Sequence, residues 1–485
     1  MINRFRIATG IAAGIAASLG LALAAPPSHA RPVSEQGKSC HLSGSEETLR
    51  CISVPVTLDY AKGGAGQLKL HVTVAPAFRE SARPDPLFVL AGGPGQAGSD
   101  VLPLLPAFRK VRATRDIVFI DQRGTGLSGK LDCEAKPGYE AMTEAELDSE
   151  ARLCIAKIGK SFAPYGTDSA ARDIEQVRRA LGYGQVNLWG GSYGTRLAQH
   201  YARSFPASVR SMILDGVAAP DQIVPAGGRD AQAALDTLFA QCKADAACNK
   251  AFPALRAEFA ALVERVAADQ LVLELSDPRT AAPLKLTMTS ERFQSTVHNI
   301  LYSPVDSRRL PFLIHSAYLG RWAPFVARRN VASDFSADGA VAILLHLAVV
   351  CGEDIPRLTP AFAAEDARGS FMGAPALARL AGLCPAVKMP AVAHRTPAMI
   401  AAPSLMLSGA LDPVTPPRRA EAAGKRMSNA QHLVVANAGH GVSHLGCAPR
   451  LMREFLDQPQ NKVDGKCLKE IPAPSFQLGS AGPQP

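Results

Sequence analysis

The chain has 485 residues, of which 47% are hydrophobic and 20% are charged. This length allows roughly two or three average domains, or one large α/β domain with an insertion, and the composition excludes a wholly disordered chain. The formal net charge is +9, but the basic residues are scattered, without a run of five or more Lys or Arg. We therefore expect a mildly basic surface and no nucleic-acid partner.

The first 30 residues have the pattern of an export signal. Two arginines precede an apolar stretch of small residues, Leu and Ile, and residues 28–30 form a small-x-small cleavage pattern. A membrane anchor is the alternative, because residues 7–25 are nearly long enough to span a bilayer. The Pro26-Pro27 pair and the cleavage pattern favour export. We therefore expect residues 1–30 to be a signal peptide, with no stable membrane anchor after its removal.

Ten cysteines agree with export to an oxidising compartment, because an even number of cysteines in an exported chain predicts disulfides. They form five sequential pairs along the chain: Cys40 and Cys51, Cys133 and Cys154, Cys242 and Cys248, Cys351 and Cys384, Cys447 and Cys467. Pairing of nearest neighbours is one hypothesis among roughly 900 connectivities. No C-x-x-C occurs, so a zinc or thioredoxin-like site is not indicated. The expected location is periplasmic or extracellular.

The first half of the mature chain has the order of an α/β sheet. Alternating segments at 52–56 and 68–74 predict half-exposed antiparallel strands. Short, almost wholly apolar runs then predict buried strands of a parallel sheet at 87–90, 117–120, 186–189 and 212–214. Helical patterns at 169–181 and 195–204 lie between the later strands. This order predicts a mostly parallel sheet covered by helices.

The α/β order is interrupted after Gly216 by an Ala-rich region with helical periodicity, and strand patterns return at 404–407 and 432–435. The tail is rich in Pro, Gly and Ser. The mature chain is therefore predicted to comprise a core (31–219), a mostly helical cap insertion (220–395), the C-terminal part of the core (396–470) and a disordered tail (471–485).

A possible nucleophile lies in the pattern Gly190-x-Ser192-x-Gly194, between the predicted strand 186–189 and the helix that follows. A serine on such a strand–turn–helix elbow has an exposed Oγ. The N–H group of Tyr193, at the start of the helix, could then stabilise an oxyanion. The alternative is a glycine-rich turn without a catalytic role, but the flanking strand and helix favour the nucleophile.

A serine nucleophile needs a base and an acid that orients it. His440, in a short loop after strand 432–435, is the predicted base, with His444 as the alternative. Asp412, just after strand 404–407, is the predicted acid, and Asp215 is its rival. The chain order Ser, Asp, His is the one found in α/β hydrolases.

The loop after strand 87–90 contains Gly92-Gly93-Pro94-Gly95. Glycines there allow backbone N–H groups to point at a substrate carbonyl, so Gly93 is the predicted second oxyanion donor. An ordinary turn is the alternative.

Six motifs together resemble the exported tripeptidyl aminopeptidase and proline iminopeptidase relatives within the α/β-hydrolase fold. These motifs are AGGPGQ (91–96), DQRGTGLS (121–128), WGGSYGT (189–195), LDGV (214–217), SGALDPVTPP (408–417) and AGHG (438–441). The resemblance implies a triad of Ser192, Asp412 and His440 with oxyanion donors Gly93 and Tyr193. The segment between Cys447 and Cys467 is similar to the C-terminal part of the tripeptidyl group, where a disulfide staples the loop after the histidine.

Two residues differ from the usual pattern of the proline iminopeptidases and bear on the branch of the family. Proline iminopeptidases usually have a histidine where this chain has Ala91, and commonly have a Trp at the position of Tyr193. Both differences favour the tripeptidyl-like branch and put a strict preference for N-terminal proline in doubt.

An exopeptidase holds the free ammonium group of its substrate, and a buried carboxylate suits this role. Glu353, with Asp354 second, is the predicted anchor, and an ordinary helix-end carboxylate is the alternative. Asp121 and Arg123 are expected to brace loops rather than contact substrate.

The resemblance implies an exported serine hydrolase, an aminopeptidase that releases short N-terminal peptides or single residues through an acyl-enzyme at Ser192. An esterase or amidase acting on small molecules with the same triad is one alternative, and a catalytically inactive binding protein on this fold is another. The expected partner is a peptide or a small amide or ester. No ligand constellation indicates a metal or cofactor, and the oligomeric state stays open.

Overall fold

A computed structural model describes residues 37–63, 65–133, 138–159, 161–268, 271–278, 280–329 and 341–483. The expected signal peptide, residues 1–30, lies outside these described residues. Within them, every helix is too short or too polar to cross a membrane.

A nine-stranded sheet forms the centre of the molecule, in the order β1-β2-β3-β5-β4-β6-β7-β10-β11. Its strands are β1 (Lys38–Cys40), β2 (Leu49–Asp59), β3 (Ala65–Ala75), β4 (Leu87–Leu90), β5 (Ile117–Ile120), β6 (Val186–Gly191), β7 (Val209–Asp215), β10 (Ser404–Gly409) and β11 (Ala430–Val435). The first three strands and β5 pair antiparallel, and all pairs from β5 to β11 are parallel. Every residue of β4, β5 and β10 is buried, because helices cover both faces of a parallel sheet.

Helices on the two faces of the sheet bury apolar stripes against it. On one face lie α1 (Arg109–Arg112) and α16 (Ala448–Asp457), and on the other lie α3 (Thr167–Ala180), α4 (Tyr193–Ser204) and α15 (Pro417–Gly424). In α16 the buried residues are Ala448, Leu451, Met452, Phe455 and Leu456, the spacing of a single helical face. The mostly parallel, helix-covered sheet expected from the sequence is therefore present.

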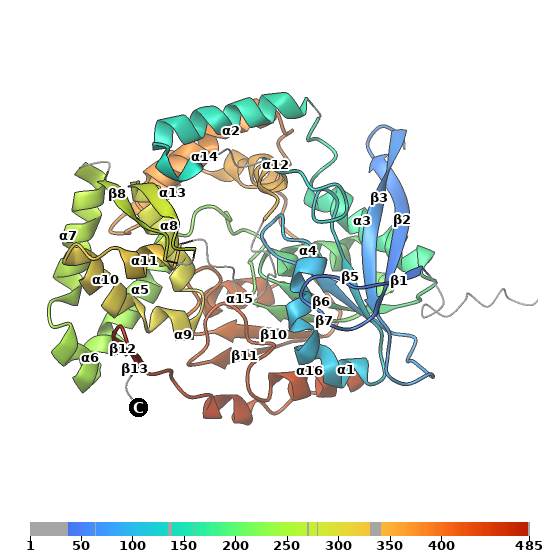
Figure 1. Ribbon diagram of the computed structural model, residues 1–485. Coiled ribbons are helices and arrows are strands. Elements are labelled where there is room, and N and C mark those ends of the chain that lie inside the picture. The colour runs from blue at the N-terminus through green and yellow to red at the C-terminus, as the bar shows by residue number, and fades with distance from the viewer. Residues whose placement is uncertain are drawn as a thin grey trace, which may run out of the picture.

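The insertion between β7 and β10 is mostly helical and has a core of its own. Its helices are α5 (Gly228–Ala244), α6 (Ala246–Ala251), α7 (Leu255–Ala268), α8 (Ser290–Ile300), α9 (Pro304–Ser307), α10 (Leu310–Tyr318), α11 (Ala323–Val326), α12 (Ile343–Glu353), α13 (Pro360–Ala367) and α14 (Pro375–Val387). An antiparallel hairpin of β8 (Leu271–Ser276) and β9 (Pro283–Met288), which the sequence analysis did not predict, joins them. Phe259, Phe293 and Phe325 stack within this second core. Figure 1 shows the insertion gathered to one side of the sheet.

One helix from the first part of the sequence packs on the insertion. Helix α2 (Glu144–Ile158) lies beside α14, where Arg152 donates to the carbonyl of Gly382 at 3.0 Å and Arg379 to Asp148 at 3.0 Å (Figure 1). The sequence division at residue 219 assigns this helix to the core. In space, its contacts with α14 join it to the cap.

The tail differs from the prediction of disorder. Residues 477–479 and 482–483 form the strands β12 (Gln477–Gly479) and β13 (Gly482–Pro483), which pair antiparallel. Phe476 is buried, the Arg308 guanidinium lies 4.1 Å from its ring centroid, and Gln477 N donates to the Arg308 carbonyl. Composition alone indicated a flexible tail, but one buried aromatic side chain anchors it to the insertion. The prediction is wrong for residues 471–483, and residues 484–485 lie outside the described part.

The ten cysteines form five disulfides between nearest neighbours: Cys40–Cys51, Cys133–Cys154, Cys242–Cys248, Cys351–Cys384 and Cys447–Cys467. The fourth joins α12 to α14, and the fifth connects the start of α16 to the segment that follows it.

Candidate active site

Ser192 lies on a tight turn between β6 and α4. Its φ of 54° and ψ of −125° are uncommon for a residue other than glycine and hold it in a strained conformation. The turn needs glycine on both sides: a Cβ at Gly190 would lie 2.5 Å from the Gly194 carbonyl oxygen, and one at Gly194 would lie 2.0 Å from that of Leu90. The sequence thus forms the strand–elbow–helix geometry that exposes a serine Oγ.

His440 and Asp412 form a buried pair. The distance from His440 Nδ1 to Asp412 Oδ2 is 2.8 Å, and both residues are more than nine-tenths buried. Asp412 also accepts hydrogen bonds from the N–H groups of Val414 and Thr415 and from Thr415 Oγ1, at 2.8, 2.9 and 2.7 Å. These bonds fix the carboxylate, which in turn orients the imidazole and leaves Nε2 for proton transfer.

The pair stabilises the charged form of each partner. Burial by itself would lower the pKa of His440, but the Asp412 carboxylate outweighs this effect, and the pKa is raised from its usual value. Burial would likewise raise the pKa of Asp412, but the charge and hydrogen bond of His440 and the bonds from Thr415 lower it overall. The imidazole is thus a stronger base than it would be if buried alone.

The alternative residues are placed elsewhere. The Asp215 carboxylate is buried and accepts hydrogen bonds from the backbone N–H groups of Val442 and Ser443, at 2.8 to 3.0 Å. It therefore holds the loop after the histidine, and the His440 ring bonds to Asp412. His444 is exposed, in contrast to the buried His440.

Two backbone N–H groups are available as oxyanion donors. Gly93, at φ 101°, and Tyr193, the first residue of α4, both line the cavity that contains Ser192. Within the described residues, neither backbone N–H donates a hydrogen bond to a protein acceptor. Gly92 N is bonded to Gln96 Oε1 at 3.1 Å, which holds the loop in position. Unpartnered donors beside a nucleophile are what an oxyanion hole requires.

His440 lies beside the cavity that Ser192 lines, because it contacts the lining residues Thr415 and Tyr302. Among the described residues no hydrogen bond joins Ser192 Oγ to His440, and such catalytic bonds are often long before substrate binds. The His440 ring packs edge-on against Tyr302, with centroids 4.9 Å apart, and Tyr302 lines the cavity together with Ser192. The three predicted triad residues thus follow the carboxyl ends of β6, β10 and β11, the edge of the sheet where ligands bind in open α/β folds.

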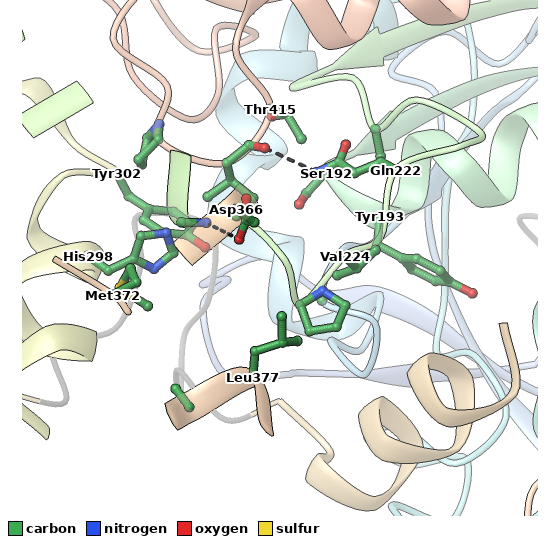
Figure 2. A pocket seen from close by; sticks show the side chains of 18 of the residues that line it. Ser192, Tyr193, Gln222, Val224, His298, Tyr302, Asp366, Met372, Leu377 and Thr415 are labelled. Carbon is green, nitrogen blue, oxygen red and sulfur yellow. Dashed lines mark hydrogen bonds between the residues drawn. The ribbon is translucent and has the colours of Figure 1, made fainter. Parts of the chain in front are cut away.

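The cavity has a volume of about 220 Å³ and lies between the sheet and the insertion. Ser192, Tyr193 and Thr415 come from the core, and residues including His298 and Asp366 come from the insertion (Figure 2). No Lys or Arg is among the lining residues that the structure describes. Nor does the described part of the chain contain a cluster of three or more His, Cys, Asp or Glu able to hold a metal ion.

Glu353 and Asp354 lie outside this cavity, in an ion-pair network. Arg196 donates to Glu353 at 2.9 Å and to Asp354 at 2.8 Å. Thr167 donates to Glu353 through both N and Oγ1, and its Oγ1 lies 2.6 Å from the Tyr193 hydroxyl. This arrangement argues against the prediction that they bind a substrate ammonium, because Arg196 pairs with both acids and Arg357 pairs with Asp354 as well. The network instead holds the first turn of α4 against α12.

The two residues of the DQRGTG motif make structural contacts. Asp121 accepts hydrogen bonds from Ser99 N and Leu127 N, at 2.7 and 2.9 Å. Arg123 is buried, pairs with Asp173 and donates to three backbone carbonyls. These contacts brace the loops beside the site, as the sequence analysis expected.

Sequence reasoning missed several residues around the cavity. Thr415 lies inside the recognised motif at 408–417, so its position three residues after Asp412 was a usable signal. His298, Tyr302 and Asp366 come from the insertion, where no motif marks them. Only the packing of the insertion helices brings them to the serine.

Two protein families match this chain. The family described as alpha/beta hydrolase fold matches residues 85–261, and the family described as TAP-like protein matches residues 370–467. Together with the sheet order and the elbow, the first match decides the fold class. The chain is an α/β hydrolase by fold. The TAP-like match covers the segment that contains both Asp412 and His440.

The curated proteins that are similar over part of this α/β-hydrolase chain include the following three. Serine protease Hip1 of Mycobacterium tuberculosis is 32% identical over 222 residues, 41% of this chain and 42% of that protein. Tripeptidyl aminopeptidase of Streptomyces lividans is 31% identical over 194 residues, 36% of each chain. Carboxylesterase B of M. tuberculosis is 33% identical over 289 residues, 53% of this chain and 52% of that protein. The match thus spans about half or less of each relative.

Proposed function

We propose that the protein is an exported serine aminopeptidase that releases short N-terminal peptides or single residues through an acyl-enzyme at Ser192. The observation that supports the proposal is the buried Asp412–His440 pair, whose imidazole contacts Thr415 and Tyr302 at the edge of the cavity that the strained Ser192 lines. A strained turn and a buried ion pair are both costly to maintain, and they cluster at functional sites.

Each group has a defined role in the proposed reaction. Ser192 Oγ attacks the scissile carbonyl carbon while His440 Nε2 accepts the hydroxyl proton, and this proton then passes to the leaving amine as the C–N bond breaks. Asp412 holds the Nδ1–H and stabilises the imidazolium. The N–H groups of Gly93 and Tyr193 stabilise the oxyanion. Water then attacks the acyl-enzyme. His440 accepts the proton from this water and passes it to Ser192 Oγ as the acyl group is released.

Peptide bonds are the preferred substrate because two of the similar proteins bear the names serine protease and tripeptidyl aminopeptidase. A second candidate is hydrolysis of small esters or amides, since another similar protein is named carboxylesterase B. The same triad performs either reaction, because both pass through a tetrahedral oxyanion and an acyl-enzyme.

A first experiment tests whether the site reacts at all. The mature protein is treated with a fluorophosphonate probe beside its Ser192→Ala variant. Labelling of the wild type and loss of labelling in the variant support a serine hydrolase. Labelling that persists in the variant, or fails in the folded wild type, would overturn the assignment and favour a non-catalytic binding protein.

A second experiment separates peptidase from esterase. Chromogenic amides of one, two and three residues are compared with free and acetylated N-termini, beside p-nitrophenyl esters. An aminopeptidase loses most of its kcat/KM when the N-terminus is blocked. Indifference to blocking, together with fast ester hydrolysis, would support the esterase instead.

The export proposal rests on the sequence of residues 1–30 and on five disulfides, which form and persist in oxidising compartments. Expression with the complete N-terminus and sequencing of the exported product tests it. The expected mature N-terminus is Arg31, and a product retained in the cytoplasm with Met1 would contradict it.

A further inference from the structure

The cavity beside Ser192 carries a single negative side chain. Asp366 is its only lining carboxylate within the described residues, and no Lys or Arg lines it. The pKa of His298 is lowered to about 4 by burial and by the nearby charge of His440, and burial also lowers the pKa of His346. Both imidazoles are therefore neutral at pH 7, so the cavity suits a ligand with a positive charge.

Asp366 is buried but lacks a cationic partner. It is 7% exposed, and its oxygens accept hydrogen bonds from the backbone N–H groups of Gly228 at 2.8 Å and Arg229 at 3.4 Å. The described residues contain no Lys, Arg or His paired with it, and the guanidinium groups of Arg229 and Arg368 pair with the neighbouring Glu365. A carboxylate has about four acceptor sites, so two N–H bonds leave capacity for a further donor.

We propose that Asp366 binds the free α-ammonium group of the substrate, an inference that rests on the aminopeptidase function proposed above. An ammonium group brings three donors and the charge that the buried carboxylate lacks, and such a pair is strong where water is excluded. Figure 2 shows Asp366 and Ser192 among the side chains that surround one cavity.

The size of the cavity limits what lies between the two groups. About 220 Å³ is smaller than most ligand pockets, which measure roughly 300–1,000 Å³. An ammonium bound at Asp366 with its acyl carbon at Ser192 therefore leaves room for a short N-terminal segment only. The carboxylate would also disfavour chains with a blocked N-terminus, because such chains bring no positive charge to neutralise it.

The comparison with Glu353 explains why this acid, and not the predicted one, has the role. Glu353 lies against Arg196, and its charge is satisfied before any substrate arrives. Asp366 meets only backbone N–H groups at the start of α5, so no full positive charge pairs with it and a cation from the substrate can do so.

The test measures the preference for a free over an acetylated N-terminus, as the ratio of kcat/KM for matched leucine p-nitroanilides. Asp366→Asn keeps an acceptor for Gly228 N but removes the charge, and we expect the ratio to fall on the order of 100-fold. Glu365→Gln removes a charge one residue away on an exposed side chain and serves as the matched control, with an unchanged ratio. A purely structural role for Asp366 would lower both rates together and leave the ratio intact, which would overturn the inference.

Two further comparisons distinguish failure of the Asp366 inference from failure of the proposed aminopeptidase function. If wild-type protein shows no preference for free amines, the proposed aminopeptidase function fails and the inference with it. If the wild type has the preference and Asp366→Asn retains it, only the inference fails. N-acetyl-lysine and N-acetyl-leucine p-nitroanilides are also compared, because selective loss on the lysine substrate would assign Asp366 to a side-chain ammonium and overturn the α-ammonium assignment.

A second variant covers the case in which Asp366→Asn does not fold. Met372 lines the same cavity, and Met372→Lys would place an ammonium group there while leaving Asp366 intact. We expect this variant to lose the preference for free N-termini, with Met372→Gln as its control. An unchanged preference in a folded Met372→Lys protein would count against the inference.

Discussion

The core and the helical insertion differ in how their sequences encode the site. In the core, each residue of the proposed triad follows a strand of the parallel sheet, so Ser192, Asp412 and His440 lie at the same edge of it. In the insertion, residues such as His298 and Asp366 reach the cavity from separate helices without a shared motif. The proposed triad thus depends on short loops with local signals, whereas the lining that the insertion gives to the cavity depends on how distant helices pack.

Two acidic residues of the insertion also differ in a way that only packing determines. Glu353 and Asp366 are both buried carboxylates near the end of a helix, yet Arg196 neutralises the first and no described cation reaches the second. Burial of an acid therefore says little about its role until its partners are known. The following experiments test this division between core and insertion.

The largest expected effect comes from the nucleophile. Ser192→Ala should lower kcat by on the order of 10⁴- to 10⁶-fold, because the covalent route is lost and only the oxyanion donors remain. Hydrolysis of a chromogenic amide measures the loss. Ser204→Ala, at the exposed end of the same helix, is the control and should retain full activity. Near-normal turnover in Ser192→Ala would remove the serine from the mechanism.

The next effect distinguishes the two aspartates that follow strands. Asp412→Asn should lower kcat by about 10⁴-fold with little change in fold, because the imidazole loses its orienting charge. Asp215→Asn should instead lower the free energy of unfolding by about 1–3 kcal/mol, because Asp215 holds backbone N–H groups of the loop after His440. Kinetics and thermal unfolding of both variants provide the comparison, and reversed phenotypes would reassign the acid.

A third prediction concerns the ion-pair network of the insertion. Glu353→Gln should lower the free energy of unfolding by about 1–3 kcal/mol, because Arg196 and Thr167 lose a charged hydrogen-bond partner while Arg196 keeps Asp354. The ratio of kcat/KM for free over blocked substrates should stay unchanged, whereas Asp366→Asn is expected to lower it. Chemical denaturation and the paired p-nitroanilides measure the two quantities. A selective loss of the preference for free amines would restore Glu353 as the anchor.

The smallest expected effect is the pH profile. The proposed base must be neutral to accept a proton, and Asp412 raises the pKa of His440 from its usual value of about 6.5. The acid limb of kcat/KM should therefore lie above pH 6.5, with activity falling about tenfold per pH unit below it. A pH series on the wild-type enzyme checks this. A limb well below pH 6 would show that another group, or an unpaired imidazole, controls the rate.

Local patterns in the sequence predicted much of the core. Apolar runs such as 117–120 and 404–407 correspond to the strands β5 and β10, since a run that is buried on both faces has few other structures available. The position of α2 was not predicted, because an amphipathic helix does not reveal which partner covers it. The order of the tail was missed because the burial of Phe476 depends on Arg308, about 170 residues earlier.

The sequence by itself determined the sheet, the elbow and the candidate triad, because strand patterns and the short loops after them are encoded by neighbouring residues. The tertiary structure alone decided which carboxylate is neutralised and which faces the cavity. That outcome depends on whether a guanidinium reaches the acid: Arg196 of α4 meets Glu353 of α12, whereas Asp366 of α13 meets only the backbone of α5. Such partners lie far apart in the chain, and only packing brings them together.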